Sequence, residues 1–250
     1  MLVLNGLTKD FGEKLAVDSV DLDLLPGERF CLMGPNGAGK TTVMRMMVGL
    51  SRPTRGSVEL LGEDPLEEPA IRRNLGYLSD KPYIYDKLTS REHLRLHAAL
   101  YKLPFREILH KGTALLDRLG MGEALDQRAE TLSLGMQKKL ALALALAHEP
   151  KIVILDEPMN GLDPDSAERV EKLLVRYSED NRSVFLSTHS VEFAARFASR
   201  VGVLQEGGLT VHEVREAVEA RWIRDLLSQE GDRPEGRRQI NRINEEQVSQ

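Results

Sequence analysis

Hydrophobic and polar residues alternate along the first part of the chain as they do in strands. Apolar residues alternate with acidic ones from Val17 to Leu25, the pattern of a half-buried strand. Pro26-Gly27 then predicts a turn. The apolar run Arg29–Met33 predicts a short strand that leads directly into a glycine-rich segment, and Ser57–Leu61 predicts another strand. The first third of the chain is therefore expected to be rich in β structure.

Apolar residues at helical spacing follow the glycine-rich segment and return in the middle of the chain. Residues 41–50 predict a helix whose buried face is formed by Val43, Met46, Met47 and Leu50. From about residue 80 to 135 the spacing predicts a mostly helical lobe, in which a helix starts at Thr89 or Ser90 with acidic Glu92 close behind. Residues 140–147 predict a buried helix, since they alternate Leu and Ala and are too few to span a bilayer.

Buried strands are predicted again at Ile152–Leu155 and Ser183–Ser187. This alternation of strands and helices favours an α/β fold with a mainly parallel sheet, an N-terminal antiparallel β portion and the inserted helical lobe. We expect one domain over residues 1–210. Residues 211–250 are expected to hold a helix and a polar tail, because an apolar stripe is followed by almost entirely polar residues. The stripe consists of Val211, Val214, Val218, Trp222 and Leu226.

Composition limits the classes of partner. The 250 residues are 41% hydrophobic, enough for a sizeable core, and carry a formal net charge of −5. The isoelectric point of about 5.8 weighs against nucleic acid as a partner. One cysteine, Cys31, lies in an apolar run and is expected to be a core residue in a reducing compartment. The N-terminal residues lack the pattern of a secretion signal, and no run of about 18 apolar residues predicts a membrane span.

The strongest chemical signal is a glycine-rich sequence between a predicted strand and a predicted helix. It follows the pattern G-x-x-x-x-G-K-[ST], in which glycines let backbone N–H groups approach phosphates, the lysine adds a positive charge and the hydroxyl is a ligand for Mg²⁺. Its residues are Gly34, Pro35, Asn36, Gly37, Ala38, Gly39, Lys40 and Thr41, and the predicted site also includes Thr42. ATP and Mg²⁺ are therefore the expected ligands, and the alternative is a glycine turn that merely links strand to helix.

A second signal is a pair of carboxylates at the end of the predicted strand Ile152–Leu155. Ligands bind at the carboxyl ends of strands in open α/β sheets. Asp156 is predicted to hold Mg²⁺, and Glu157 to act as the general base that deprotonates the attacking water. The alternative is a strand that simply ends in solvated acids.

The order of these motifs resembles that of the ATP-binding cassette (ABC) ATPases, which are built on a P-loop NTPase core. The resemblance covers roughly residues 2–210. Leu132-Ser133-Leu134-Gly135-Met136 lies where the family signature Leu-Ser-Gly-Gly-Gln is found. The other matching positions are Phe11 for adenine stacking, Asp80 for the usual Gln, Asn160-Gly161-Leu162-Asp163 for the D-loop and His189 for the switch histidine.

The resemblance implies a site shared between two copies that meet head to tail. Ser133 and the backbone of Gly135 would then reach the γ-phosphate of the ATP held by the other copy. His189 would hold the γ-phosphate and the attacking water, and Asp163 would line the seam. Asp80 is shorter than the usual Gln, so its direct contact with Mg²⁺ is left open.

The resemblance also implies a function. The expected role is an ATP-hydrolysing motor subunit that energises transport, with polytopic membrane subunits as partners and a second copy or a related ATPase as the other half of a dimer. The chain would then be cytoplasmic and held at the inner face of the membrane by its partner. The signature ends in Gly135-Met136 and is followed by Gln137 and Lys138, which favours the bacterial export type. The alternatives are a soluble ABC ATPase acting on the ribosome or DNA, and an ATP-dependent interaction module that does not hydrolyse ATP.

Overall fold

The computed structural model describes residues 1–214 and 227. Within them the strands form two sheets. The smaller sheet is antiparallel, with the order β2-β1-β4. The larger has the order β5-β6-β7-β3-β8-β9 and is parallel except for the pairing of β8 with β9. The predicted α/β class is confirmed. The strands are β1 (Leu2–Asp10), β2 (Leu15–Leu24), β3 (Arg29–Met33), β4 (Arg55–Leu60), β5 (Leu75–Leu78), β6 (Ile152–Leu155), β7 (Ser183–Ser187), β8 (Arg200–Gln205) and β9 (Gly208–Glu213).

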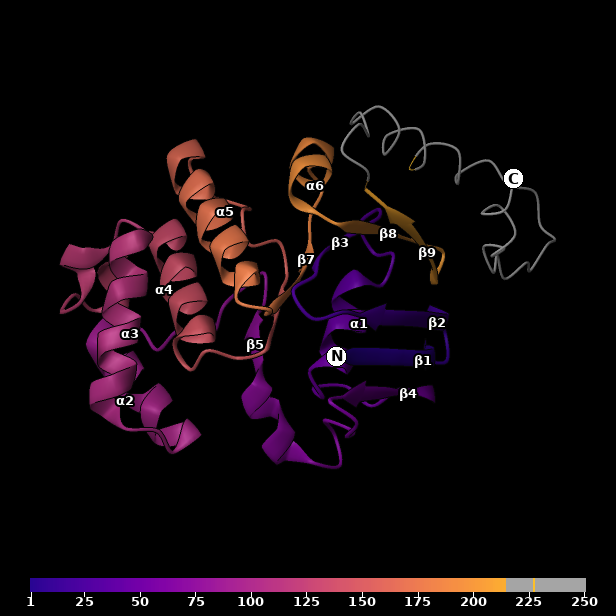
Figure 1. The fold of residues 1–250 in the computed structure, drawn as a ribbon, viewed down its shortest axis with the longest axis horizontal. Coiled ribbons are helices and arrows are strands. Elements are labelled where there is room, and N and C mark those ends of the chain that lie inside the picture. The colour runs from indigo at the N-terminus through magenta and orange to yellow at the C-terminus, as the bar shows by residue number, and fades with distance from the viewer. Residues whose placement is uncertain (215–226, 228–250) are drawn as a thin grey trace, which may run out of the picture.

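Helices cover the larger sheet and build a lobe at one side. Figure 1 shows α2, α3 and α4 on the side of the molecule opposite to the antiparallel sheet. The α-helices are α1 (Lys40–Met47), α2 (Ser90–Tyr101), α3 (Phe105–Arg118), α4 (Leu134–Ala147), α5 (Pro164–Glu179) and α6 (Val191–Phe197). Short 3₁₀ turns are η1 (Pro69–Asn74), η2 (Gly122–Ala124) and η3 (Ala129–Thr131). None of the helices among the described residues is long and apolar enough to cross a bilayer.

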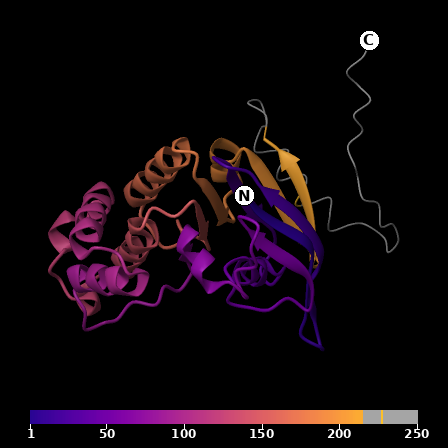
Figure 2. The same cartoon turned by 60° about the horizontal axis from the view of Figure 1, so that its bottom comes forward.

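The alternating pattern of β2 has the predicted consequence. Leu22 and Leu24 are buried, and the aspartates between and before them face outward. The buried face of this sheet packs with β3 and α1, where Phe30 and Phe185 stack with ring centroids 5.1 Å apart. In Figure 2 the indigo strands of the antiparallel sheet lie beside the yellow-orange β-ribbon formed by β8 and β9. The two sheets therefore share one core next to the start of α1.

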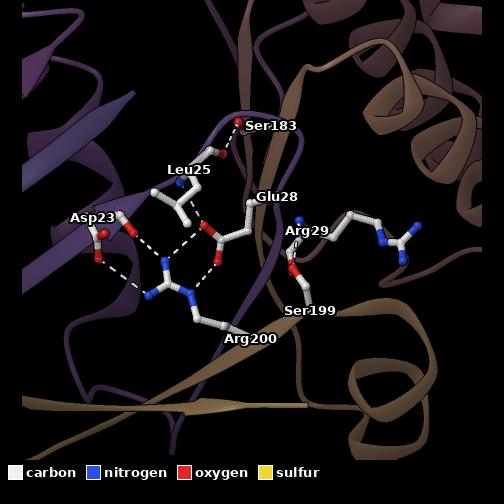
Figure 3. A network of polar contacts seen from close by, with 7 residues as sticks. All are labelled: Asp23, Leu25, Glu28, Arg29, Ser183, Ser199 and Arg200. Atoms are coloured by element: carbon white, nitrogen blue, oxygen red, sulfur yellow. Dashed lines mark hydrogen bonds and ion pairs between the residues drawn. The ribbon is translucent and has the colours of Figure 1, made fainter. Parts of the chain in front are cut away.

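A largely buried ion pair joins the turn between β2 and β3 to β8 (Figure 3). Arg200 donates from Nε to Glu28 Oε1 over 2.6 Å and from Nη2 to Glu28 Oε2 over 2.9 Å. Glu28 Oε2 also accepts the backbone N–H of Leu25 over 2.8 Å, and Ser183 Oγ donates to Leu25 O over 2.6 Å. The contacts fix the turn that carries the chain from the antiparallel sheet into β3, and hence the position of the glycine-rich segment.

The helical lobe begins where the sequence predicts. Thr89 is the N-cap of α2, and its side chain and that of Glu92 form a reciprocal capping box. Helices α2 and α3 pack closely because Gly112 leaves room for Leu94: a Cβ at position 112 would lie 2.2 Å from Leu94 Cδ2. Helix α4 is buried from Leu140 to Ala147 at most positions, as its Leu/Ala pattern predicts.

Two predictions from apolar spacing are wrong in detail. Leu50 lies beyond the end of α1 and is exposed, because the chain turns away at Gly49, which has a φ of +69°. Val211 lies in strand β9 and pairs with Gly202 of β8, so no helix begins at residue 211. Val214 directly follows β9, and the rest of the predicted apolar stripe, Val218 to Leu226, lies outside the described residues. Cys31 is fully buried, as predicted.

Candidate functional site

The glycine-rich segment forms a bend between β3 and α1 in which three glycines have positive φ. Gly34 has φ +146°, Gly37 has φ +80° and Gly39 has φ +108°. At Gly34 a Cβ would lie 2.1 Å from Leu204 O, and at Gly39 it would lie 2.3 Å from Ala16 O. Any other residue would therefore clash with the backbone at these two positions. Helix α1 has no side-chain cap at its N-terminus, so backbone N–H groups of its first turn are free to bind an anion.

Lys40 is buried inside this bend. Its Nζ donates to Gly34 O over 2.7 Å and to Pro35 O over 3.1 Å. Burial lowers the pKa of Lys40, and the nearby carboxylates of Glu157 and Asp156 oppose this shift by favouring the charged form. The ammonium group is thus held by loop carbonyls at the place where a phosphate would bind.

Asp156 is tied to the loop and to the neighbouring strand by two hydroxyl groups. Thr41 Oγ1 donates to Asp156 Oδ2 over 2.7 Å, and Ser187 Oγ donates to Asp156 Oδ1 over 2.7 Å. Ser187 Oγ also accepts the backbone N–H of Glu157 over 2.9 Å. Sequence reasoning did not single out Ser187. The signal that could have found it is its place as the last residue of β7, beside the end of β6.

Glu157 has a strained backbone and a partly buried carboxylate. Its φ of +47° is uncommon for a residue with a side chain and costs about 1–3 kcal/mol, a strain that occurs mostly at functional sites. Glu157 Oε1 lies 2.9 Å from His189 Nε2, but it accepts no hydrogen bond within the described residues. Burial raises the pKa of Glu157, while His189 and Lys40 pull it down. A buried acceptor atom without a donor has room to receive one from a ligand or water.

These residues line one cavity of about 550 Å³. Phe11 lies at its edge with its side chain exposed, and Lys9 Nζ is 5.2 Å from the ring centroid. Lys14, Ala16 and Asn160 also line the cavity, although sequence reasoning did not include them in the site. The predicted site residues found in the lining are Phe11, Asn36, Gly37, Gly39, Lys40, Thr41, Thr42, Asp80, Asp156, Glu157 and His189.

Asp80 faces the cavity from the loop after β5. Its side chain is 43% exposed, and its Oδ1 lies 3.4 Å from Lys138 Nζ of α4. The carboxylate is therefore loosely held and open to the cavity. Whether it contacts a metal stays a prediction.

Ser133 and Gly135 do not line this cavity. Ser133 caps α4, and its Oγ accepts the backbone N–H of Met136 over 3.3 Å. Gly135 lies against the D-loop, since a Cβ there would be 3.4 Å from Leu162 Cδ2. The neighbouring Leu134 is 84% exposed. Ser133 and Leu134 are thus exposed, and neither Ser133 nor Gly135 lines the cavity next to the chain's own phosphate loop.

Asp163 is the N-cap of α5. Its Oδ1 accepts the backbone N–H of Ser166 over 2.9 Å, and hydrogen bonds from Ser166 lower the pKa of this carboxyl group. The predicted place of Asp163 at a seam between two subunits is untested by these contacts.

The donor set fits a metal-bound nucleotide. Thr41 supplies a hydroxyl and Asp156 a carboxylate, the hard oxygen ligands that Mg²⁺ takes while keeping several waters. The described residues contain no cluster of three or more acidic, His or Cys side chains that could hold a metal alone. A metal here would therefore need the oxygens of a nucleotide and water as further ligands.

Comparison with known proteins gives consistent matches. Residues 17–160 match the protein family described as ABC transporter. The chain is 40% identical over 210 residues to ATP-binding cassette sub-family A member 7 of Rattus norvegicus, an alignment that covers 83% of this chain and 10% of that protein. It is 34% identical over 208 residues to the bacitracin transport ATP-binding protein BcrA of Bacillus licheniformis, covering 81% of this chain and 66% of BcrA.

A solved structure shares the fold. The dimeric ATP-binding cassette MJ0796, in a post-hydrolysis state bound to ADP and phosphate, has a TM-score of 0.78 and 27% identity. That alignment covers 86% of this chain and 99% of the MJ0796 chain. The present chain spans about a tenth of the length of the sub-family A relative and about two thirds of BcrA.

Proposed function

Because the chain belongs to the ABC transporter family of ATP-binding proteins, we propose that it is an ATP-hydrolysing motor subunit that energises transport through separate membrane subunits. ATP hydrolysis is the activity of this family. The observation that carries the proposal is the cavity in which Lys40, Asp156 and Glu157 converge on the bend before α1.

Each of these groups has a distinct task in phosphoryl transfer, which is catalysed mainly by positioning and charge neutralisation. The backbone N–H groups of the bend and the Lys40 ammonium bind the β- and γ-phosphates. Thr41 and Asp156 would hold Mg²⁺, which supplies a fixed positive charge beside the phosphate oxygens. Ser187 keeps the Asp156 carboxylate in place by its hydrogen bond.

Glu157 serves as the general base. Its Oε1 is buried without a hydrogen-bond donor, so an attacking water can donate to it. Burial raises the pKa of Glu157 and so makes the carboxylate a better proton acceptor than an exposed glutamate. His189, whose Nε2 lies 2.9 Å away, orients the carboxylate and contributes a donor toward the γ-phosphate. This arrangement argues against a module that binds ATP without hydrolysing it.

The remaining predicted contacts are with the adenine ring and with the nucleotide of a second copy. Phe11 has an exposed ring at the edge of the cavity, suited to stacking on adenine. Ser133 and Gly135 face outward beside the D-loop, where they can complete the nucleotide site of a second copy. The dimeric MJ0796 structure supports a two-fold assembly of this kind.

The membrane partner would dock on the lobe side of the molecule. A groove of about 480 Å³ lies between the lobe and the sheet, with a largely apolar lining that includes Leu50, Tyr83 and Leu144. Tyr83 is 94% exposed and Tyr85 is also exposed, so neither packs in the lobe core. A polytopic membrane subunit can bury these rings, which would hold the chain at the inner face of the membrane. The sequence Gly135-Met136, followed by Gln137 and Lys138, supports the export direction.

Two measurements test the proposal. Phosphate release from Mg-ATP by the purified chain is expected to be saturable and to disappear in Lys40→Ala. When the chain is expressed in cells and purified from their membranes, it should co-purify with a polytopic membrane protein. Less of that protein should co-purify with Tyr83→Ser. An inactive wild-type chain would contradict the motor function, and an active chain that associates with ribosomes or DNA in place of membranes would favour the soluble alternative.

A further inference from the structure

Lys138 of α4 places a charged group between two loops of the nucleotide cavity. The residue is only 6% exposed. Its Nζ donates to Asn160 O over 3.0 Å and lies 3.4 Å from Asp80 Oδ1. Both Asp80 and Asn160 line the cavity, whereas Lys138 itself stands behind them. A buried ammonium group is costly unless it is paired and hydrogen-bonded, so these two contacts account for its position.

Lys138 lies close enough to attract the carboxylate of Asp80 but leaves it available to a ligand. Its distance of 3.4 Å from Nζ is long for a charge-assisted hydrogen bond, which is usually 2.7–2.9 Å. Nearly half of the Asp80 side chain remains exposed toward the cavity. The carboxylate of Asp80 lines the same cavity as Asp156 and Glu157, so its charge acts on the site of a bound nucleotide. Lys138 therefore screens a negative charge that acts on the site.

We propose that Lys138 is a positioning residue that restrains Asp80 and thereby sets how strongly this carboxylate attracts the metal of a bound metal-nucleotide. The proposal rests on the proposed function, because it concerns the same site. The same ammonium group holds the backbone of Asn160, so a shift of Asp80 toward the metal is transmitted to the D-loop and to α4. Lys138 therefore connects α4, which begins with the signature residues, to Asp80 in the lining of the chain's own cavity.

The adjacent Lys139 provides a matched control. It is on the same helix, is equally buried, and its Nζ donates to Ser166 Oγ over 3.2 Å. The Asp80 carboxylate pairs with Lys138, whereas the hydrogen-bond partner of Lys139 is on α5. Replacing either lysine by methionine removes one buried positive charge and one hydrogen bond to the 160–166 region, but only Lys138→Met frees the Asp80 carboxylate.

The test is a calorimetric titration of the full chain with AMP-PNP at a series of fixed Mg²⁺ concentrations. We expect Lys138→Met to lower, by about three- to tenfold, the Mg²⁺ concentration at which the affinity for AMP-PNP reaches half of its value at saturating Mg²⁺. A change of this size is the expected effect of one nearby charge on a partly exposed carboxylate. Lys138→Arg should behave like the wild type, because it keeps the charge. Lys139→Met should change thermal stability without a comparable shift in the Mg²⁺ dependence.

The double variant Lys138→Met/Asp80→Asn separates the pair from a general charge effect. If Asp80 carries the response, the double variant has the same Mg²⁺ dependence as Asp80→Asn alone. Asp80→Asn alone should raise the Mg²⁺ concentration needed for tight AMP-PNP binding. Because Asp80 is partly exposed, this variant should fold, so the role of its carboxylate can be tested even if Lys138→Met does not fold. A shift that persists without the Asp80 carboxylate, an equal shift in Lys139→Met, or an unaffected Asp80→Asn would overturn the inference. A wild-type chain that binds no AMP-PNP would instead overturn the proposed function.

Discussion

Glu157 Oε1 and His189 Nε2 lie 2.9 Å apart at the ends of neighbouring strands, and the positive φ of Glu157 turns its carboxylate toward the phosphate loop. In the proposed function this pair acts on the attacking water. Lys40, Thr41 and Asp156 form hydrogen bonds with the loop or with one another, whereas Glu157 Oε1 faces His189 Nε2 but accepts no hydrogen bond within the described residues.

The first prediction concerns this base. Glu157→Gln keeps the shape and removes the proton acceptor, so the rate of phosphate release should fall by about 10²–10⁴-fold. The affinity for Mg-ATP should stay within a few-fold of the wild type, and ATP should accumulate in a stable dimer seen by size-exclusion chromatography. Glu168→Gln, at an exposed position on α5, is the matched control and should retain full activity. A Glu157→Gln chain that hydrolyses ATP at the normal rate would show that another group is the base.

The second prediction concerns Ser187, which holds both Asp156 and the backbone of Glu157. Ser187→Ala removes the hydrogen bonds to Asp156 Oδ1 and to the backbone N–H of Glu157, while Thr41 still donates to Asp156 Oδ2, so the free energy of unfolding should decrease by about 1–3 kcal/mol. The rate of hydrolysis should also fall, because the two carboxylates lose their alignment. Chemical denaturation and phosphate release measure the two effects. Ser178→Ala, which removes a buried hydroxyl bonded to Val175 O and far from the cavity, should affect stability alone.

The third prediction is a pH dependence of stability at the junction between lobe and sheet. His97 Nε2 and His148 Nδ1 lie 3.1 Å apart, and His148 Nε2 lies 3.0 Å from Leu75 O. Burial lowers the pKa of His97 from 6.5 to about 4. The folded state therefore binds fewer protons than the unfolded state between these values, so stability is present above pH 6.5 and is lost as the pH falls toward 4.

Substitution of His97 tests this sign. The lowering of the pKa of His97 from 6.5 to about 4 sets an upper limit of about 3–4 kcal/mol for the loss of stability, and the partial exposure of the pair makes about 1–2 kcal/mol the expected value. In His97→Gln the loss of stability between pH 7 and pH 5 should be smaller than in the wild type, as measured by urea denaturation. His110→Gln, at an exposed position of α3, should leave the pH dependence unchanged. Equal slopes for wild type and His97→Gln would contradict the assignment.

The fourth prediction concerns the ion pair between the two sheets. Glu28→Ala leaves the Arg200 guanidinium, which is 20% exposed, with Asp23 as its remaining charged partner, so the free energy of unfolding should fall by about 1–3 kcal/mol. The double variant Glu28→Ala/Arg200→Met should lose less than the sum of the single variants, because the uncompensated charge is removed as well. Additive losses in urea denaturation would show that the two residues do not act as a pair.

Several parts of the structure were predictable because local chemistry determines them. The bend at Gly34 to Thr41 requires glycines and a lysine wherever it occurs, and the strands β3, β6 and β7 are short apolar runs that have the predicted bounds. The capping box at Thr89 and Glu92 is likewise a local pattern. These features depend on residues within a few positions of one another.

Other features depend on packing between distant segments. Val211 fits a helical stripe, yet the turn at Glu206-Gly207, where both φ values are positive, folds β9 back on β8 as a hairpin. A glycine turn at residue 207 is the local pattern that indicates a hairpin here, whereas the apolar spacing from Val211 onward indicates a helix. Ser187 and Lys138 are ordinary in sequence and gain their roles from partners 31 and 58 positions away. Pairwise contacts of this kind cannot be derived from one sequence.

The most direct test of the central claim is equilibrium binding of Mg-AMP-PNP to the wild-type chain and to Lys40→Ala, measured side by side. The account predicts one nucleotide bound per chain and a loss of at least about tenfold in affinity, or about 1.4 kcal/mol, when the Lys40 ammonium is removed. No binding to the folded wild-type chain at millimolar ligand, or equal affinity of the two proteins, would contradict it.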